Sequence, residues 1–343
     1  MKIGIYTFRS EGCPQWDPDS IRSGITGSEE AVIYMAKELA NLGHIVQVFA
    51  DVPSGSVHAK EGANPRYVSL EAAESQQFDI AICWRWPGIG SFLKEKRLAK
   101  KVYLWPHDTL EGIASSEGFD DVLWLSEWQR EQWISTVPSF ARFTKIFGNG
   151  IELKQVPPLS PRENPYSCIY GSNYGRGLVF LLHIWPHLKK RFPQATLDIY
   201  YGWQHWGLLT PFEERWAREA LERLPGVKEH GLVGHEELNC AYAKASFWTY
   251  PCIKPETFCI TALRAQQSGA VPVILEGSAL KHTVRSGYKC QKLEEYLPLL
   301  LRAMDSAEKI SLKERALLGK AVEKYTWQGL ALQWNALFNA KSL

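Results

Sequence analysis

Short, nearly continuous apolar segments alternate along the chain with longer segments in which apolar residues recur every three or four positions. The first pattern is typical of strands covered on both faces of a parallel sheet, and the second of amphipathic helices. The strands predicted in the first half are Lys2–Phe8, His44–Ala50, Phe78–Cys83, Val102–Trp105, Val122–Leu125 and Phe143–Phe147. A helix is predicted over Ser28–Leu42, because Gly43 follows its last apolar position.

A Pro-rich stretch, Val156–Pro161, interrupts this alternation, which then resumes. The strands predicted in the second half are Ser167–Tyr170, Ala195–Tyr201, Val227–His230, Phe247–Tyr250 and Val271–Leu275. The helices predicted there are Leu178–Arg191, Phe212–Leu224, Glu236–Lys244, Ile260–Ser268 and Trp327–Asn339. Two successive runs of this kind predict an α/β protein with two doubly wound parallel-sheet domains, which bind ligands at the carboxyl ends of their strands.

Composition narrows the class of protein. The formal net charge of +2, from 39 Lys and Arg against 37 Asp and Glu, lacks the electrostatic footprint of a nucleic-acid-binding protein. No apolar run reaches the ~18 residues of a membrane span, and the N-terminus reads as a strand rather than a signal peptide. The seven scattered cysteines disfavour a disulfide framework. We expect a cytoplasmic protein, and a peripheral contact at the inner face of a membrane stays open.

Two loops of the first half carry candidate chemistry. The loop Arg9–Gly27 is longer than the ~2–6 residues usual between a strand and a helix. It ends in Gly24-Ile25-Thr26-Gly27, whose amides suit a phosphate or a sugar, although the glycines would also simply form the turn. His107 and Asp108 follow a strand, where His107 would donate to a substrate hydroxyl. The alternative is a helix-capping Asp108 beside a surface His107.

Two further loops open helices in the second half. Arg176 lies at the end of the Gly-rich loop after Ser167–Tyr170 and would hold a diphosphate bidentately, or would merely decorate a turn. Glu256, with Lys254 just before it, follows Phe247–Tyr250 at the start of an apolar helix. The helix dipole alone would also account for that carboxylate.

Metal-ligand patterns are incomplete. Asp17 and Asp19 have the spacing of a carboxylate pair, but no third ligand is evident in the sequence. His183 and His187 lie four apart on a predicted helix, again without a further ligand. We therefore predict no metal and no other cofactor.

The 14 tryptophans are many for a chain of 343 residues. Most of them are expected to pack in the core, as large aromatic side chains usually do. Trp84, Trp86, Trp203 and Trp206 follow predicted strands and would also suit stacking on a sugar or base ring.

Taken together, these segments resemble the retaining glycosyltransferases of the GT-B fold, in the large family 4. The matching phrases are Gly27-Ser28-Glu29-Glu30-Ala31, Leu42-Gly43-His44, Leu125-Ser126-Glu127, Phe147-Gly148-Asn149-Gly150, Arg176-Gly177-Leu178, Tyr250-Pro251, Pro255-Glu256-Thr257-Phe258-Cys259-Ile260 and Gly269-Ala270-Val271-Pro272-Val273. The order and spacing of these phrases make the resemblance specific. It implies two Rossmann-like domains that face each other across a cleft.

In the terms of that resemblance, residues 1–155 are an acceptor-binding domain and residues 156–324 a nucleotide-sugar-binding domain, and the helix in residues 325–343 packs back on the first. The function implied is metal-independent, retaining transfer of a sugar from a nucleotide-sugar donor to a glycan or glycolipid acceptor. No protein nucleophile is required, because the leaving phosphate helps to take the acceptor proton.

The resemblance also gives roles to the candidate residues. Gly24, Thr26 and Gly27 would approach the donor phosphates and sugar, and His107 would hydrogen-bond the transferred sugar. Arg176 would replace the family's diphosphate-binding lysine, and Glu256 would hold hydroxyls of the donor sugar. The remaining donor-binding positions implied are the backbone segment Thr257, Phe258 and Cys259.

Three positions depart from the family pattern. The family's second motif glutamate is Arg264 here, a phosphate-binding arginine is Tyr170, and an acidic residue is His282. Either Arg264 or Lys254 supplies the lost positive charge, or donor binding is weakened. The alternative function is thus a catalytically degenerate binding or scaffold subunit, and an epimerase or phosphorylase of the same fold is a third.

Overall fold

The computed structural model describes residues 1–9, 14–73, 76–112, 114–203 and 208–340. The chain divides into two compact units. Unit 1 comprises residues 1–21, 25–150 and 325–343, and unit 2 comprises residues 22–24 and 151–324. The C-terminal segment therefore belongs to the same unit as the N-terminal strand, and almost the whole of unit 2 is inserted between them.

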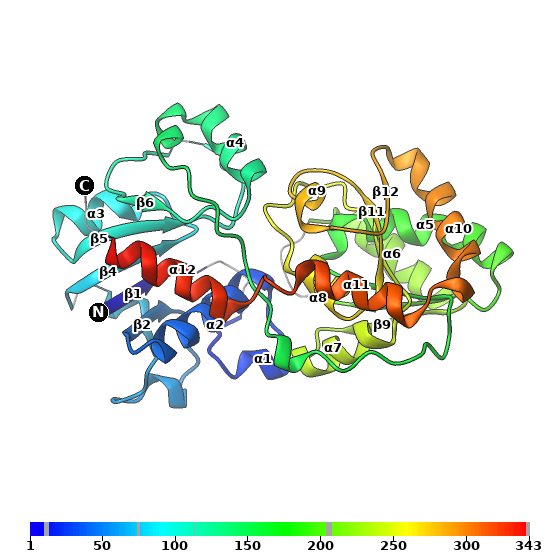
Figure 1. Ribbon diagram of the computed structural model, residues 1–343, viewed down its shortest axis with the longest axis horizontal. Coiled ribbons are helices and arrows are strands. Elements are labelled where there is room, and N and C mark those ends of the chain that lie inside the picture. Colours follow the sequence, from blue (N-terminus) through cyan, green and yellow to red (C-terminus); the bar gives the residue numbers. More distant parts are fainter. Residues whose placement is uncertain (10–13, 74–75, 113, 204–207, 341–343) are drawn as a thin grey trace. The chain divides into compact units, whose positions relative to one another are not determined.

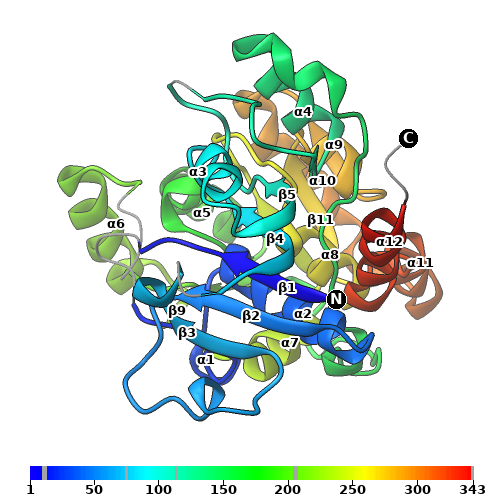
Figure 2. The same cartoon turned by 90° about the vertical axis from the view of Figure 1, so that its left-hand side faces the viewer.

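Unit 1 is built on a six-stranded parallel sheet in the order β3-β2-β1-β4-β5-β6. Its strands are β1 (Lys2–Tyr6), β2 (Ile45–Ala50), β3 (Arg66–Ser69), β4 (Phe78–Trp84), β5 (Ala99–Trp105) and β6 (Asp121–Val122). Figure 2 shows β3, β2, β1, β4 and β5 following one another across this sheet. The strand order reverses between β1 and β4, which makes their carboxyl ends the expected place for a ligand.

Helix α12 completes unit 1 by packing against α2 (Figure 1). The helices of the unit are α2 (Gly27–Asn41), α3 (Ile89–Glu95), α4 (Glu127–Thr136) and α12 (Trp327–Asn339). On α12, Trp327 stacks on Tyr34 of α2, and Trp334 packs edge-on to Trp105 of β5. The main chain of Trp327 approaches Gly150 so closely that an added Cβ at Gly150 would lie 2.4 Å from the Trp327 nitrogen. The predicted amphipathic helix over Trp327–Asn339 is confirmed.

Unit 2 repeats the same architecture in the order β12-β11-β10-β7-β8-β9, all parallel. Its strands are β7 (Ser167–Gly171), β8 (Thr196–Tyr200), β9 (Val227–Gly231), β10 (Phe247–Tyr250), β11 (Val271–Leu275) and β12 (Tyr288–Cys290). Its helices are α5 (Leu178–Arg191), α6 (Pro211–Arg223), α7 (His235–Lys244), α8 (Ile260–Gln267), α9 (Leu280–Thr283), α10 (Tyr296–Asp305) and α11 (Leu312–Val322). The short helix α1 (Ser20–Ser23) belongs partly to each unit, because the boundary falls between Ile21 and Arg22. Here the strand order reverses between β7 and β10.

The prediction of two doubly wound parallel sheets is confirmed, but one strand assignment is wrong. The segment Phe143–Phe147 is extended and forms only an isolated bridge, between Ile146 and Trp124. Phe143 packs into the core of unit 1 beside Phe140, whereas Ile146 is 38% exposed. The apolar side chains that suggested a strand thus belong to a coil anchored by one aromatic ring.

Other elements lie where no strong pattern indicated them. These are β3, β12, α1, α3, α4, α9, α10 and α11. No helix in the described part of the chain combines the length and the apolar character needed to cross a bilayer. The six described cysteines, Cys83, Cys168, Cys240, Cys252, Cys259 and Cys290, are free thiols.

Candidate functional site

Unit 2 brings two of the predicted site residues together at the point where its strand order reverses. Arg176 lies in the loop after β7, and Glu256 lies in the loop after β10. The strands β7 and β10 are neighbours in the sheet, although about 80 residues separate them in sequence. An Arg176 guanidinium nitrogen lies 3.2 Å from Glu256 Oε1 and donates to the Pro255 carbonyl at 3.0 Å.

Glu256 is held on every side. The Tyr250 hydroxyl donates to Glu256 Oε1 at 2.5 Å, and the Cys252 thiol lies 3.9 Å from the same oxygen. The Glu256 backbone N–H donates to Ser278 Oγ at 2.8 Å, so the main chain is fixed as well. The residue is 9% exposed. The carboxylate is therefore preorganised and retains lone pairs that would accept hydrogen bonds from sugar hydroxyls.

Arg176 carries a permanent positive charge into the same place. The neighbouring Glu256 carboxylate raises the pKa of the Arg176 guanidinium above its already high ordinary value. Pro255, Glu256 and Cys252 take up part of the donor capacity of this guanidinium, and its five N–H groups leave others for a phosphate. Gly177, directly after it, has φ of +113°, and a Cβ there would lie 2.0 Å from the Pro251 carbonyl oxygen. The loop thus requires glycine at position 177.

The segment Thr257–Cys259 leads into the N-terminus of α8. Cys259 is the helix N-cap, with φ of +77°, a conformation that side chains other than glycine rarely adopt. Burial raises the pKa of the Cys259 thiol well above its ordinary value. Phe258 is buried and Thr257 is half-buried. The first amides of a helix usually lack an intrahelical acceptor, which is a common setting for a bound phosphate. In α8 the Ala262 N–H already donates to the Cys259 carbonyl at 3.1 Å, so the amides before Ala262 are the ones placed for such a ligand.

The other predicted positions of unit 2 are distributed differently. Lys254 is exposed next to the site, whereas Arg264 is buried on α8 and its Nε donates to Asn239 of α7 at 2.9 Å. Tyr170 is fully buried and its hydroxyl donates to the Asn173 carbonyl, so it faces the core. His282 is exposed on α9. Among these four residues, Lys254 is therefore the one placed to add positive charge beside Glu256.

In unit 1, His107 lies in the loop after β5 and is 8% exposed. Its ring packs edge-on to Trp105 and lies 5.9 Å from the ring of Trp84. Helix α4 fixes the loop from outside, because Gln129 Nε2 donates to the carbonyls of Pro106 and Asp108. His107 is consequently a rigidly placed imidazole rather than a surface residue.

Asp108 pairs with Arg85, a residue that the sequence analysis did not single out. The Arg85 guanidinium donates to both Asp108 oxygens, at 2.5 and 2.6 Å, and lies over the Trp84 ring at 5.0 Å. Arg85 follows β4 with φ of +65°. Its charge also acts on Glu29 of α2, where burial raises the pKa of the carboxyl and Arg85 opposes that rise. No described helix is capped by Asp108, so its side chain serves this ion pair.

The glycines of the segment Gly24-Ile25-Thr26-Gly27 serve different purposes. Gly24 packs with unit 2, with φ of +112°, and a Cβ there would lie 2.5 Å from the Leu232 side chain. Gly27 is the first residue of α2, and Thr26 is its N-cap. The Thr26 hydroxyl hydrogen-bonds to Glu29 rather than to a backbone amide. The turn thus explains Gly24 structurally, and the carboxylates of Glu29 and Glu30 already occupy the first turn of α2.

The environment of His107 predicts how stability depends on pH. Burial, followed by the charge of Arg85, lowers the pKa of His107 well below 6.5. Below pH 6.5 the unfolded chain therefore binds a proton that the folded chain does not, so the free energy of unfolding falls as pH falls. His107→Gln should remove this loss, which amounts to about 1 kcal/mol between about pH 7.5 and about pH 5.5. Denaturant unfolding of both proteins at both pH values measures it, and parallel pH profiles would contradict the prediction.

The candidate stacking tryptophans differ in exposure. Trp84 is buried, Trp86 is 50% exposed, and Arg218 of α6 lies over the Trp203 ring at 4.1 Å. Trp206 lies outside the described residues. Trp86 is therefore the tryptophan of this set that offers a wide free face.

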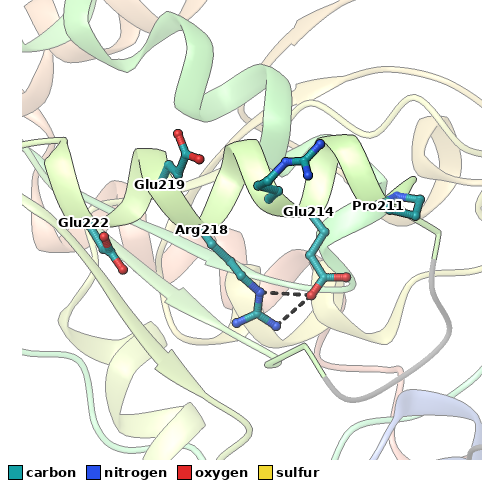
Figure 3. A pocket seen from close by; sticks show the side chains of 6 residues that line it. Pro211, Glu214, Arg218, Glu219 and Glu222 are labelled. Atoms are coloured by element: carbon teal, nitrogen blue, oxygen red, sulfur yellow. Dashed lines mark hydrogen bonds and ion pairs between the residues drawn. The ribbon is translucent and has the colours of Figure 1, made fainter.

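A shallow hollow also runs along α6, lined by Pro211, Glu214, Arg215, Arg218, Glu219 and Glu222 (Figure 3). Arg218 pairs there with Glu214 at 2.7 Å. Arg218 and Glu214 thus satisfy each other on one helix, and none of the predicted site residues lines the hollow. The hollow is therefore a feature of the helix surface rather than part of the site.

Arg85, Glu29 and Tyr250 are the site residues that sequence reasoning missed. The available signal was position: Arg85 follows β4 in unit 1 and Tyr250 ends β10 in unit 2, and each strand adjoins the strand-order reversal of its own sheet. This position could identify the residues only after the strand order was known, and the sequence did not predict that order.

Known proteins were compared with the chain by sequence and by structure. No protein-family model matches it, and no curated protein sequence matches it. Among solved structures, sucrose-phosphate synthase from Thermosynechococcus elongatus superimposes with a TM-score of 0.76 at 17% identity, over 98% of each chain. HepE from Anabaena, in complex with UDP-glucose, gives 0.73 at 13% identity, over 98% of this chain and 99% of that one.

The catalytic domain of starch synthase IV from Arabidopsis thaliana, bound to ADP and acarbose, gives a TM-score of 0.68 at 14% identity, over 98% of each chain. Matches over nearly the full length of both chains show that the two Rossmann-like units together form the GT-B fold of these proteins. The predicted fold class is confirmed.

Proposed function

We propose that the protein is a glycosyltransferase that uses a nucleotide-sugar donor. The observation that carries this proposal is the Arg176–Glu256 pair, fixed by Tyr250 at the strand-order reversal of unit 2. A cation with spare donors beside an anchored carboxylate suits a diphosphate joined to a polyhydroxylated sugar. Three proteins of the same fold carry names or ligands of sugar-nucleotide chemistry, among them HepE with UDP-glucose and starch synthase IV with ADP.

In this proposal unit 2 binds the donor and unit 1 binds the acceptor. Arg176, Lys254 and the amides of Thr257–Cys259 hold the diphosphate, and Glu256 holds sugar hydroxyls. His107 donates a hydrogen bond to the transferred sugar, for which a neutral imidazole is suited because its lowered pKa leaves one N–H and one acceptor nitrogen. Arg264 contributes by fixing α8 to α7 through Asn239.

The transfer is proposed to be retaining and independent of metal. The sugar–phosphate bond breaks as the acceptor oxygen attacks from the same face, and the acceptor proton passes to the departing diphosphate. The protein then acts by positioning the reactants and by stabilising the charge that develops on the phosphate. A glycan or glycolipid is the proposed acceptor, and Trp86 is a suitable surface for stacking on a sugar ring.

The rival function, a degenerate scaffold subunit, accounts less well for the contacts. A site released from function has no reason to keep a half-buried ion pair supported by Tyr250, Ser278 and Pro255.

Thermal unfolding in the presence of nucleotides tests the proposal. UDP, ADP, GDP, CMP and dTDP, each with its common sugars, are added to the full-length protein, and a ligand of the native state raises the melting temperature. We expect a rise for one nucleotide, with UDP and ADP as the first to test. Arg176→Met should abolish the rise, whereas Arg191→Met, which changes an exposed arginine of the same unit, should preserve it. No rise with any nucleotide, in folded protein, would favour the scaffold function.

A further inference from the structure

The structure supplies the ligand that the sequence pattern of Asp17 and Asp19 lacks. His58, in the short turn Val57–Ala59 after β2, is brought to the two aspartates by the fold of unit 1. One carboxylate oxygen of each aspartate and one imidazole nitrogen all lie within 4.8 Å of one another. The His58 Nε2 atom itself lies 3.4 Å from Asp19 Oδ2.

Two buried polar atoms near this cluster have no hydrogen-bond partner. His58 Nε2 is one, and the hydroxyl of Tyr67, a residue with 0% exposure, is the other. The Tyr67 ring lies edge-on to His58, with 6.2 Å between the two ring centroids. A buried donor or acceptor without a partner is costly, so these atoms point to a missing ligand.

Ser56 links the two sides of the cluster. Its hydroxyl donates to Asp17 Oδ2 at 2.5 Å and accepts the backbone N–H of His58 at 3.2 Å. Asp17 is 6% exposed, and its Oδ1 accepts the backbone N–H of Asp19. Such hydrogen bonds to a ligating carboxylate orient it and strengthen metal binding. The cluster thus has a supporting layer as well as three ligand atoms.

We propose that Asp17, Asp19 and His58 form a binding site for a borderline divalent cation, Zn²⁺ in the first place. An imidazole together with carboxylates favours Zn²⁺ over Mg²⁺ or Ca²⁺, which prefer oxygen ligands alone. A cation about 2.1 Å from each ligand requires ligand pairs no more than about 4.2 Å apart. The three ligand atoms lie within 4.8 Å of one another, so small side-chain adjustments complete the site. Water fills the remaining position.

This cation would be structural and separate from sugar transfer. Asp17 and Asp19 lie in the long loop between β1 and α2, and His58 lies in the loop between β2 and β3. The bond from Ser56 to Asp17 already spans 39 positions in sequence. A metal at this place fastens the two loops together, and its binding free energy adds to the stability of unit 1. The proposal does not depend on the proposed transferase activity.

Calorimetric titration of metal-free, full-length protein with ZnCl₂ tests the site. We expect one Zn²⁺ per chain, no comparable binding of Mg²⁺, and a higher melting temperature with Zn²⁺. His58→Gln and Asp19→Asn, both at partly exposed positions, should each weaken Zn²⁺ binding at least about 10-fold, and Ser56→Ala about 10-fold to 100-fold. His183→Gln, which changes an exposed histidine on α5, is the matched control and should bind Zn²⁺ as the unmodified protein does.

Hydrogen exchange adds a readout that reports the place of binding. Zn²⁺ should slow exchange in residues 17–23 and 56–59 of the unmodified protein and leave both segments unchanged in His58→Gln. Absence of Zn²⁺ binding, or binding of equal strength in His58→Gln and Asp19→Asn, would overturn the proposal. Tight Mg²⁺ binding would overturn the assignment to a borderline cation.

Discussion

Replacing Glu256 by glutamine should lower the rate of sugar transfer by about 10²–10³-fold. Glutamine retains the shape of the side chain and an oxygen for the Tyr250 hydroxyl, but it removes the charge that pairs with Arg176. The carboxylate would bind sugar hydroxyls most strongly as charge develops at the reacting carbon, so the loss falls on kcat more than on KM. Initial rates over a range of donor concentrations measure the two constants.

The control for this variant is Glu214→Gln on α6. Glu214 is also paired with an arginine in unit 2, at 2.7 Å, but it lies on an exposed helix outside the site. It should transfer sugar at the unmodified rate, and both variants should show the circular dichroism of the folded protein. Full turnover by Glu256→Gln would remove Glu256 from the mechanism.

Replacing His107 by alanine should also lower transfer by about 10²–10³-fold, but without weakening nucleotide binding. His107 belongs to unit 1, whereas the proposed phosphate ligands belong to unit 2. The imidazole is held between Trp105 and Trp84 with its loop fixed by Gln129, so its hydrogen bond to the sugar needs no rearrangement. Isothermal titration with the nucleotide, together with transfer rates, separates the two effects.

His44→Ala is the matched control in the same unit. His44 is likewise buried, at 7% exposure, but it lies at the start of β2, where its Nε2 is 3.0 Å from the Asn335 side-chain oxygen. The substitution should lower stability and leave the rate per folded molecule unchanged. Equal loss of transfer in both variants would indicate that His107 acts only through the stability of unit 1.

The sequence predicted elements better than it predicted neighbours. Continuous apolar runs located β10 and β11, and a helical period of apolar residues located α5, all with correct ends. A strand buried on both faces is apolar throughout, whereas a helix buried on one face is apolar at every third or fourth residue, so the two patterns differ. The prediction failed at Phe143–Phe147, where the ring of Phe143 is buried although the segment pairs with no strand. A run of apolar residues indicates that the side chains are buried, but it does not show whether the main chain pairs with a neighbouring strand.

The candidate site shows the same limit more sharply. Arg176 and Glu256 were each recognised by position after a strand, and their pairing follows from the adjacency of β7 and β10. Arg85 was missed because a single arginine after an apolar strand is common, and only Asp108 and the reversal between β1 and β4 give it meaning. His58 was missed as a partner of Asp19 for the same reason: the two lie on different loops.

The division of the chain has a consequence for the order of folding during synthesis. Unit 1 is incomplete until residues 325–343 have been made, because α12 supplies the aromatic side chains that cover α2 and β5. Nearly all of unit 2, residues 151–324, leaves the ribosome before that helix. The nascent chain therefore carries an exposed apolar surface on its first unit until α12 has been made.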